Sequence, residues 1–359
     1  MKRILIDALT ANTGGGWTYL VNLVAELERD DRGLDFTVLV EAERAAGLDA
    51  SCVRIVPIET GGTFKRVLYE EFVLPWRARA FDLLYCVAEL APAFAFTPTV
   101  VALRNLNVYD RRFYDTSRLR WLERLTRAGA RRAHRVLFPS AASAAWISRH
   151  LGIDATRTAV VPHGIAPEIF TRFEADEAER SRPYLLVPAA VERHKNIEVT
   201  VAAMQEIDET IELWIAGGTE TDPDYVASLR AQAVASGVLE RVRFLGGVSY
   251  GKMVGFYRHA MGVVLPSRIE TFGHPLLEAM ALERPLLVSD LPVFHEIANG
   301  AAWRFGLDAP HELAAAVRRI QDEPDEVERR IGLGRERVAL YSWARSVDRL
   351  CEVFHEIVD

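Results

Sequence analysis

Residues 267–278 read Ser-Arg-Ile-Glu-Thr-Phe-Gly-His-Pro-Leu-Leu-Glu, so seven residues separate the two carboxylates Glu270 and Glu278. The preceding run 262–266 is apolar and predicts a buried strand. Pro275 suits the first position of a helix that continues beyond Glu278. The pattern therefore predicts Glu270 in a strand-to-helix loop and Glu278 in the first helical turn.

Such a loop lies at the carboxyl end of a parallel strand, which is where open α/β sheets bind ligands. We expect the backbone N–H groups of Phe272, Gly273 and His274 to point outward, as they do at a helix start. This combination suits a ligand rich in hydroxyl and phosphate groups. A structural explanation stays open for each part, because a first-turn Glu offsets the helix dipole and a Gly-His-Pro turn also simply begins a helix.

Short apolar runs alternate with helical patterns along the whole chain, which is the βαβ rhythm of parallel sheets. In the first part the predicted strands are 4–6, 36–40, 83–86, 100–103 and 136–138. After a charged break the rhythm restarts, with predicted strands at 184–187, 213–216, 242–245, 263–265 and 286–288. The sequence thus predicts an α/β protein with two doubly wound sheets.

The same break sets the predicted domain boundaries. Residues 1–164 form the first domain, residues 165–182 a linker and residues 183–342 the second domain. A last helix over 343–359 is expected to return to the first domain.

The spacing of Glu270 and Glu278 resembles the E-x7-E signature of retaining glycosyltransferases of family 4. Further similar pieces are Gly14-Gly15-Gly16, Val160-Val161-Pro162-His163-Gly164, Lys195-Asn196, Phe244-Leu245-Gly246 and Tyr257-Arg258-His259-Ala260. This resemblance spans nearly the whole chain. It implies the GT-B fold, in which two Rossmann-like domains face a central cleft.

Lys195 lies between a predicted strand and a predicted helix, where a cation can neutralise a diphosphate, although a solvated surface lysine is the alternative. Asn196 is expected to cap that helix. Members of the family usually read Gly-Arg-Leu-x-x-x-Lys-Gly here, but this chain has Ala190 at the arginine position. The hypothesis is that Arg193 replaces that charge. The resemblance implies Glu270, Lys195 and Arg193 as the catalytic group.

The resemblance also implies how a nucleoside diphosphate sugar is bound. Glu278 would accept hydrogen bonds from the ribose diol, and Glu270 would reach the transferred sugar. The other donor-binding residues implied are Gly15, Gly16, Lys195, Gly246, Val248, Phe272, Gly273 and His274. Glycines in the 14–16 loop let the backbone approach a ligand closely, whereas Gly246-Gly247 also fits a simple turn.

Arg104 and Asn105 follow a predicted strand of the first domain and are the candidate acceptor-side residues. Many relatives carry a histidine where this chain has Arg104, so no catalytic histidine carries over. Arg104 binds an acidic group of a substrate or, equally, a nearby carboxylate of the protein.

No cofactor or metal is expected. The carboxylates of Asp222 and Asp224 are expected in a loop far from the loops that carry the family motifs.

The implied reaction moves a sugar from a nucleoside diphosphate to a hydroxyl with retention at the anomeric carbon. GDP-mannose and UDP-sugars both stay open as donors, and a glycan, a lipid-linked molecule or a small molecule as acceptor. The leaving phosphate itself can take the acceptor proton. Two alternatives are a GT-B epimerase or phosphorylase, and a paralogue that binds sugar nucleotides without transfer.

The formal net charge is −7, which gives no reason to expect a nucleic acid partner. Three scattered cysteines and the lack of a signal-like or membrane-spanning apolar run predict a cytoplasmic location. Residues 111–135 nevertheless form a basic block with nine arginines: Arg111, Arg112, Arg118, Arg120, Arg124, Arg127, Arg131, Arg132 and Arg135. This block predicts peripheral contact with anionic lipid or a lipid-linked diphosphate, with a solvated arginine face as the alternative.

Overall fold

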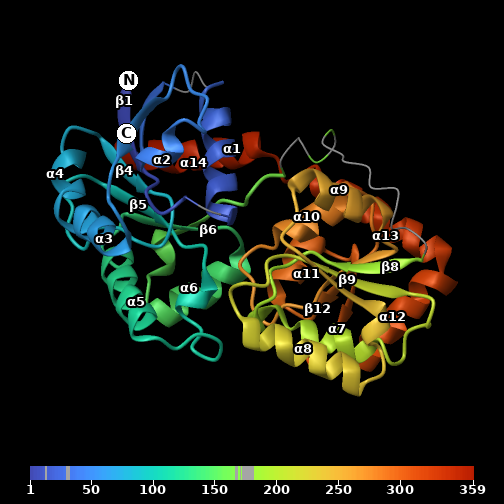
Figure 1. The fold of residues 1–359 in the computed structure, drawn as a ribbon. Helices are drawn as coiled ribbons and strands as arrows, with labels where there is room; N and C mark the ends of the chain where they lie inside the picture. The colour runs from blue at the N-terminus through green and yellow to red at the C-terminus, as the bar shows by residue number, and fades with distance from the viewer. Residues whose placement is uncertain (13, 30–32, 166–168, 170, 172–181) are drawn as a thin grey trace. The chain divides into compact units, whose positions relative to one another are not determined.

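A computed structural model describes residues 1–12, 14–29, 33–165, 169, 171 and 182–359 of the chain. It divides into two compact units, each with its own parallel sheet (Figure 1). The first unit comprises Met1–Gly164 and Ser342–Asp359, and the second comprises Ile165–Tyr341. Most of the predicted linker 165–182 lies outside the described residues.

The sheet of the first unit has seven strands in the order β3-β2-β1-β4-β5-β6-β7, and all of its pairings are parallel. The strands are β1 Lys2–Asp7, β2 Leu34–Glu41, β3 Arg54–Ile58, β4 Leu83–Cys86, β5 Thr99–Ala102, β6 Arg135–Phe138 and β7 Thr158–Val160. Chain order reverses between β1 and β4, so the loops that follow these two strands flank the switch point.

Seven α-helices belong to the described part of this unit. They are α1 Gly14–Leu27, α2 Ala42–Ala45, α3 Thr63–Phe72, α4 Leu74–Ala78, α5 Ser117–Ala130, α6 Ala141–Leu151 and α14 Trp343–Val358, with short 3₁₀ turns η1 Leu106–Val108 and η2 Ala155–Arg157. The last helix, α14, packs against α1 and β4. Its Phe354 is fully buried, with its ring centroid 5.3 Å from that of Tyr85. Residues from opposite ends of the chain therefore share one core.

The second unit has six parallel strands in the order β10-β9-β8-β11-β12-β13. They are β8 Tyr184–Val187, β9 Glu212–Ala216, β10 Val242–Gly246, β11 Gly262–Leu265, β12 Leu286–Ser289 and β13 Ala302–Phe305. The helices are α7 Ile197–Ala203, α8 Pro223–Ala235, α9 Tyr250–His259, α10 His274–Ala281, α11 Pro292–Ala298, α12 Pro310–Asp322 and α13 Pro324–Val338, with 3₁₀ turns η4 Arg193–Lys195 and η5 Leu239–Arg241. Its switch point lies between β8 and β11.

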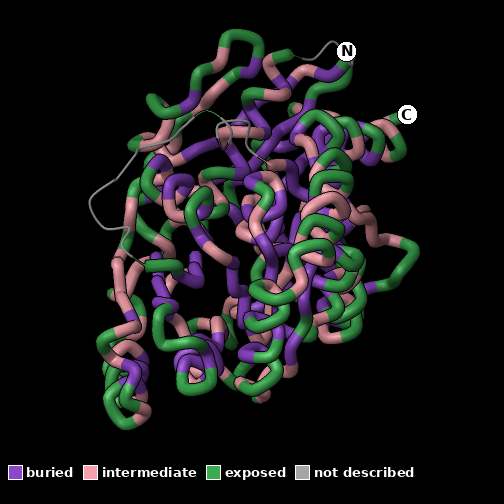
Figure 2. Tube along the Cα trace, turned by 90° about the vertical axis from the view of Figure 1, so that its right-hand side faces the viewer, coloured by how far each residue is buried: buried purple, intermediate pink, exposed green. Residues whose placement is uncertain are grey.

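Burial follows the strands in both units. In Figure 2 the buried residues run along the interior strands, while exposed residues gather on the outer turns of the helices. Apart from the run of β10, which is mostly half-buried, the apolar runs that predicted strands are buried on both faces, as expected for parallel sheets covered by helices. No helix in the described ranges is both long and apolar enough to span a bilayer.

Three strands were not predicted, and all three lie at sheet edges. They are β3, β7 and β13. Strand β3 contains Pro57, which lowers its strand signal, and β7 has only three residues, all half-buried. In β13 the sequence Ala-Trp-Arg-Phe includes an exposed arginine. Edge strands need only one hydrogen-bonded neighbour and one buried face, so their sequences lack a continuous apolar run.

The shared core makes a prediction about α14. Phe354→Ala removes a fully buried ring and should lower the free energy of unfolding of the first unit by about 3–5 kcal/mol. Glu352→Ala, on the exposed face of the same helix, should change it by less than about 0.5 kcal/mol. Thermal and chemical denaturation of the two variants measure the difference. Equal stability of both variants would show that α14 does not complete this core.

Candidate functional site

Two loops flank the switch point of the second sheet. The chain leaves β8, passes through η4 and enters α7; it also leaves β11 and enters α10. Because β8 and β11 are adjacent and parallel, both loops emerge at the same edge. The backbone N–H of Arg268 in the second loop donates to the carbonyl of His194 in the first, at 2.8 Å. The main chain itself thus joins the two loops.

Lys195 and Glu270 make the side-chain link between these loops. The ammonium Nζ of Lys195 lies 2.9 Å from Oε2 of Glu270, and about a fifth of each side chain is exposed. Burial opposes ionisation of Glu270, but the charge and hydrogen bond of Lys195 outweigh it and hold the pKa of Glu270 below its ordinary value. The site therefore holds a charged pair, brought together from positions 75 residues apart.

The residues on either side of Lys195 have structural roles. Burial and the neighbouring Lys195 charge lower the pKa of His194 to about 4, so this ring is neutral near pH 7. Asn196 adopts a left-handed conformation, with φ 54°, before α7. Asn196 is the N-cap residue of α7, as predicted, but its side chain donates to the carbonyl of Leu307 at 2.8 Å and makes no capping hydrogen bond.

Glu278 lies one residue further into its helix than expected. Helix α10 begins at His274, with Pro275 as its second residue, so Glu278 is the fifth residue and not in the first turn. The hydroxyl of Tyr257 in α9 donates to Oε2 of Glu278 at 2.7 Å. Burial raises the pKa of Glu278, against the effect of hydrogen bonds from Tyr257 and Tyr250. Neither tyrosine was among the predicted site residues, although Tyr257 belongs to the motif Tyr257-Arg258-His259-Ala260.

The turn between Glu270 and Glu278 is tightly packed. Phe272 is buried, and its ring makes edge contacts with His274 and Tyr341. Gly273 has φ 88°, and a Cβ there would lie 3.0 Å from the ring of Phe294. Both conditions require glycine at this position. This turn therefore fixes where α10 begins.

Arg193 pairs with Asp222, although residues 222–224 were expected far from the loops that carry the family motifs. Its Nε lies 3.0 Å from Oδ2 of Asp222, which caps α8 by accepting from the N–H of Tyr225. The expectation that residues 222–224 lie far from the motif loops is wrong, because β8 and β9 are adjacent and their following loops meet. In the described ranges no three His, Cys, Asp or Glu side chains gather closely enough to hold a metal ion.

Gly246 is the last residue of β10, and Val248 lies in the loop from β10 to α9. A register shift at 244–246 ends the strand, and Gly246 has φ 68°. Its carbonyl accepts from the N–H of Gly217 at 2.9 Å. There is open space where side chains at Gly246 and Gly247 would lie. The loop leads into the helix that carries Tyr257, the partner of Glu278.

Gly15 and Gly16 belong to the first unit. They were expected in a loop, but they form the first turn of α1, which begins at Gly14. A side chain at Gly15 would meet open space, whereas one at Gly16 would contact Ala11 at 3.4 Å. The main chain of this turn is thus open on the side of Gly15.

Arg104 is held by aromatic residues. Its guanidinium carbon lies 3.3 Å from the ring centroid of Tyr19 in α1, and Nη2 donates to the hydroxyl of Tyr85 at 2.7 Å. The carboxylate Oε1 of Glu89 accepts from the backbone N–H groups of Arg104 and Asn105. Asn105 caps the η1 turn by accepting from the N–H of Asn107. Glu89, Tyr19 and Tyr85 thus position this pair.

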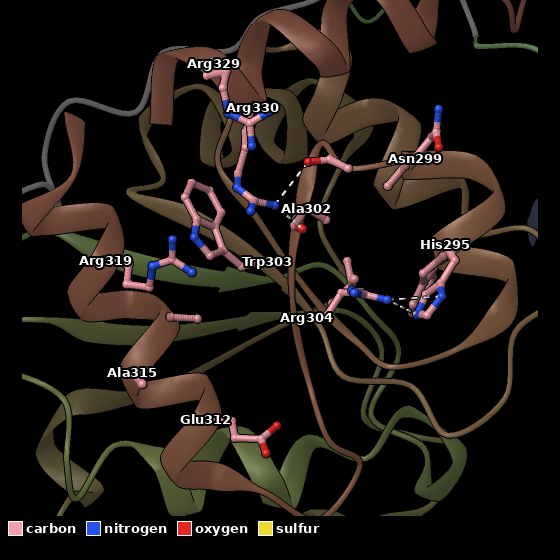
Figure 3. A pocket seen from close by; sticks show the side chains of 15 residues that line it. His295, Asn299, Ala302, Trp303, Arg304, Glu312, Ala315, Arg319, Arg329 and Arg330 are labelled. Atoms are coloured by element: carbon pink, nitrogen blue, oxygen red, sulfur yellow. Dashed lines mark hydrogen bonds between the residues drawn. The ribbon is translucent and has the colours of Figure 1, made fainter. Parts of the chain in front are cut away.

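A separate pocket of about 650 Å³ lies over the edge strand β13 (Figure 3). Arg304 points toward His295 on one side of the strand, and Trp303 points toward Arg319 on the other. Its arginines already have partners: Arg304 contacts His295, Arg319 pairs with Glu323, and Arg329 and Arg330 pair with Glu326. None of the predicted site residues lines this pocket.

Comparison with known proteins covers both units. The model described as Glycosyltransferase Family 4 matches residues 13–169, and the one described as Glycosyl transferases group 1 matches residues 169–337. The O-antigen chain mannosyltransferase RfbU of Salmonella typhimurium is 29% identical over 237 residues, which are 64% of this chain. The match spans 65% of RfbU, less than two thirds of its length.

Solved structures match over almost the whole chain. Sucrose-phosphate synthase from Thermosynechococcus elongatus gives a TM-score of 0.77 at 20% identity, over 99% of each chain. HepE of Anabaena, in complex with UDP and glucose, gives 0.75 at 15% identity, over 99% of this chain and 100% of HepE. These similarities confirm the predicted GT-B fold with two Rossmann-like domains. The central cleft between the domains stays a prediction.

The ion pair makes a prediction with a defined pH dependence. The pKa of Glu270 is lower in the folded protein than its ordinary value of 4.5. The ion pair therefore stabilises the fold at pH values above 4.5, and this stabilisation is lost as the pH falls through the pKa of the folded state. Lys195→Met removes the cation, so burial becomes the main influence on Glu270 and should raise its pKa. The variant should lose about 2 kcal/mol of stability near pH 7 and less near pH 4.

Thermal melts at the two pH values measure this effect. The double variant Lys195→Met/Glu270→Gln removes both charges and should recover part of the loss. An equal loss at both pH values, or no recovery in the double variant, would contradict the pairing.

Proposed function

The chain belongs to glycosyltransferase family 4, and from this membership we propose that it transfers a sugar from a nucleoside diphosphate sugar to an acceptor hydroxyl, with retention at the anomeric carbon. The observation that carries the proposal is the Lys195–Glu270 pair at the switch point of the second sheet. Ligands of open α/β sheets bind at this edge. A carboxylate for sugar hydroxyls and a cation for phosphate are therefore side by side.

The proposed donor contacts use the free hydrogen-bonding capacity of this pair. An ammonium group has three donors, so Lys195 can hold Glu270 and a phosphate oxygen together. Arg193 uses Nε for Asp222, and its guanidinium offers further N–H groups to the same diphosphate. We assign Arg193 the charge that the family places at the position of Ala190.

The remaining proposed contacts bind the ribose, the base, the sugar and the phosphate of the donor. Glu278, oriented by Tyr257, accepts from the ribose hydroxyls. Main-chain groups of Gly246 and Val248 hold the base, and those of Phe272, Gly273 and His274 hold sugar hydroxyls or phosphate oxygens. From the first domain, Gly15 and Gly16 contact the donor phosphate, while Arg104 and Asn105 lie on the acceptor side.

In the proposed reaction, the bond between the anomeric carbon and the diphosphate oxygen breaks while the acceptor oxygen bonds to that carbon on the same face. The leaving diphosphate takes the acceptor proton. Lys195 and Arg193 stabilise the charge that develops on the diphosphate, which is where preorganised cations have their largest effect. No protein base and no metal are needed for these steps.

Two findings on relatives bear on the substrates. RfbU is described as an O-antigen chain mannosyltransferase, which favours a mannosyl donor and a polysaccharide acceptor. HepE binds UDP and glucose, which keeps UDP-sugars open. Cys52, Cys86 and Cys351, all within the described ranges, form no disulfide, which supports the proposed cytoplasmic location.

Binding of a donor tests the proposal directly. In a thermal-shift panel of GDP-, UDP- and dTDP-sugars, one donor should stabilise the protein, by about 2.7 kcal/mol at a hundredfold excess over Kd. Glu270→Gln should lower transfer from that donor by about 100-fold. Glu240→Gln, an exposed carboxylate on η5, is the matched control and should leave transfer unchanged.

The outcomes separate the proposal from its alternatives. Stabilisation by a donor without transfer or slow donor hydrolysis would indicate a binding paralogue. Stabilisation followed by release of an isomerised sugar nucleotide would indicate an epimerase. No stabilisation by any donor would contradict the proposal.

Metal independence makes a separate prediction. Because lysine and arginine, not a divalent ion, are assigned to the diphosphate, EDTA should leave the transfer rate unchanged. Rates measured in EDTA and after addition of Mg²⁺ or Mn²⁺ check this. A rate that EDTA abolishes and Mg²⁺ restores would overturn the assignment.

A further inference from the structure

Exposed apolar side chains gather on one part of the first unit. Of the twelve large apolar side chains that are exposed in the described ranges, seven lie between residues 64 and 96. We call six of them the aromatic patch: Phe64, Leu68, Phe72, Trp76, Phe94 and Phe96. Soluble monomers rarely expose contiguous apolar groups, and such groups mark interaction surfaces.

The spacing of three patch residues places them on one face of α3. Phe64, Leu68 and Phe72 follow one another at intervals of four along α3, and Trp76 lies on the next helix, α4, beyond a break at Val73. Side chains at intervals of four stack along one side of a helix. Phe72 is 69% exposed and Trp76 is 61% exposed, so both side chains face away from the core.

The loop after β4 extends the aromatic patch. The ring centroid of Phe96 lies 4.8 Å from those of both Trp76 and Phe94. The guanidinium of Arg79 lies 4.9 Å from the ring of Phe96 and 5.4 Å from that of Trp76. A cation therefore sits directly on the aromatic rings.

Positive charge borders the aromatic patch. Lys65 on α3, Arg77 on α4 and Arg79 directly after α4 are exposed. Two arginines of the basic block reach its margins: Arg118 donates to the hydroxyl of Thr63, and Arg132 donates to the carbonyl of Ala93 at 2.7 Å.

The acidic residues of α3 do not cancel this charge. Glu70 is 2% exposed, burial together with nearby Asp7 raises its pKa to about 9, and its Oε1 lies 3.5 Å from Nε of Arg66, so it adds no negative charge to the surface. Glu71 is half-buried, and its carboxylate accepts from the N–H of Ala93. The surface of α3 and α4 is thus apolar and cationic.

The basic block by itself offers less free charge than its sequence indicates. Arg111 and Arg127 both pair with Glu123, Arg112 pairs with Asp110, and Arg120 with Asp115. Arg131 donates to the carbonyl of Leu151, and Arg135 pairs with Glu356. Most of these guanidinium groups are engaged within the first unit.

We propose that the aromatic patch is a docking surface for an anionic lipid bilayer. Phenylalanine and tryptophan rings insert at the level of the lipid headgroups, and the bordering lysine and arginines bind acidic headgroups. Apolar insertion and charge attraction act together, as two signals are needed for stable peripheral binding. This surface replaces the basic block as the main membrane contact.

Flotation of the full chain with lipid vesicles tests the proposal without any sugar donor, so its result is independent of the transfer reaction. Wild-type protein should float with vesicles of phosphatidylcholine and phosphatidylglycerol, and much less with phosphatidylcholine alone. High salt should weaken binding without abolishing it, because the apolar contribution remains. Phe72→Ser/Trp76→Ser should lower the bound fraction at least about fivefold.

A matched control uses exposed apolar residues of the second unit. Val234→Ser/Leu340→Ser changes two comparably exposed side chains and should bind vesicles as wild type does. Circular dichroism and melting curves confirm that both double variants are folded. Light scattering reports whether the aromatic patch instead joins two copies of the chain.

Three results would overturn the proposal. The first is wild type that does not float with the acidic vesicles. The second is a patch variant that binds as well as wild type. The third is a patch that buries itself in a dimer, shown by a dimeric wild type and a monomeric Phe72→Ser/Trp76→Ser.

Discussion

The constraint on which this molecule depends is the direction of its strands. In a parallel sheet every strand ends at the same edge, so the loops that follow neighbouring strands must meet there. In the second sheet this rule brings the loop after β8 against the loop after β11. The Lys195–Glu270 pair and the hydrogen bond from Arg268 to His194 then hold the two loops together. A partly buried lysine and glutamate tolerate this position because each compensates the other.

Neighbouring side chains set the charge state of this site. His194 is neutral because it is buried beside Lys195, so it does not compete for Glu270 as a second cation. Asp222 fixes the direction of Arg193, and Tyr257 fixes that of Glu278. Each group assigned to the donor is thus oriented by a residue from a different loop or helix. Preorganised groups of this kind stabilise developing charge without reorganising during the reaction.

One loop of the first domain combines two roles. After β4, Glu89 binds the backbone of Arg104 and Asn105, and a few residues later Phe94 and Phe96 complete the aromatic patch. The loop whose Glu89 positions the proposed acceptor-side pair therefore also carries part of the proposed membrane surface. The pocket over β13, by contrast, is lined by arginines whose charges are compensated within the second domain.

The sequence by itself determined the class of fold, ten of the thirteen strands in the described ranges, and the positions of Glu270, Lys195 and Glu278 on particular loops and helices. It did so because interior parallel strands are continuous apolar runs and because proline and glycine mark helix starts. The edge strands β3, β7 and β13 were not predicted, since an edge strand needs no continuous apolar run. Only the tertiary structure decided which distant side chains meet: Arg193 with Asp222, Tyr257 with Glu278, Arg104 with Tyr19, and Arg135 with Glu356. Pairing between distant positions depends on strand order and helix packing, which no local pattern of residues encodes.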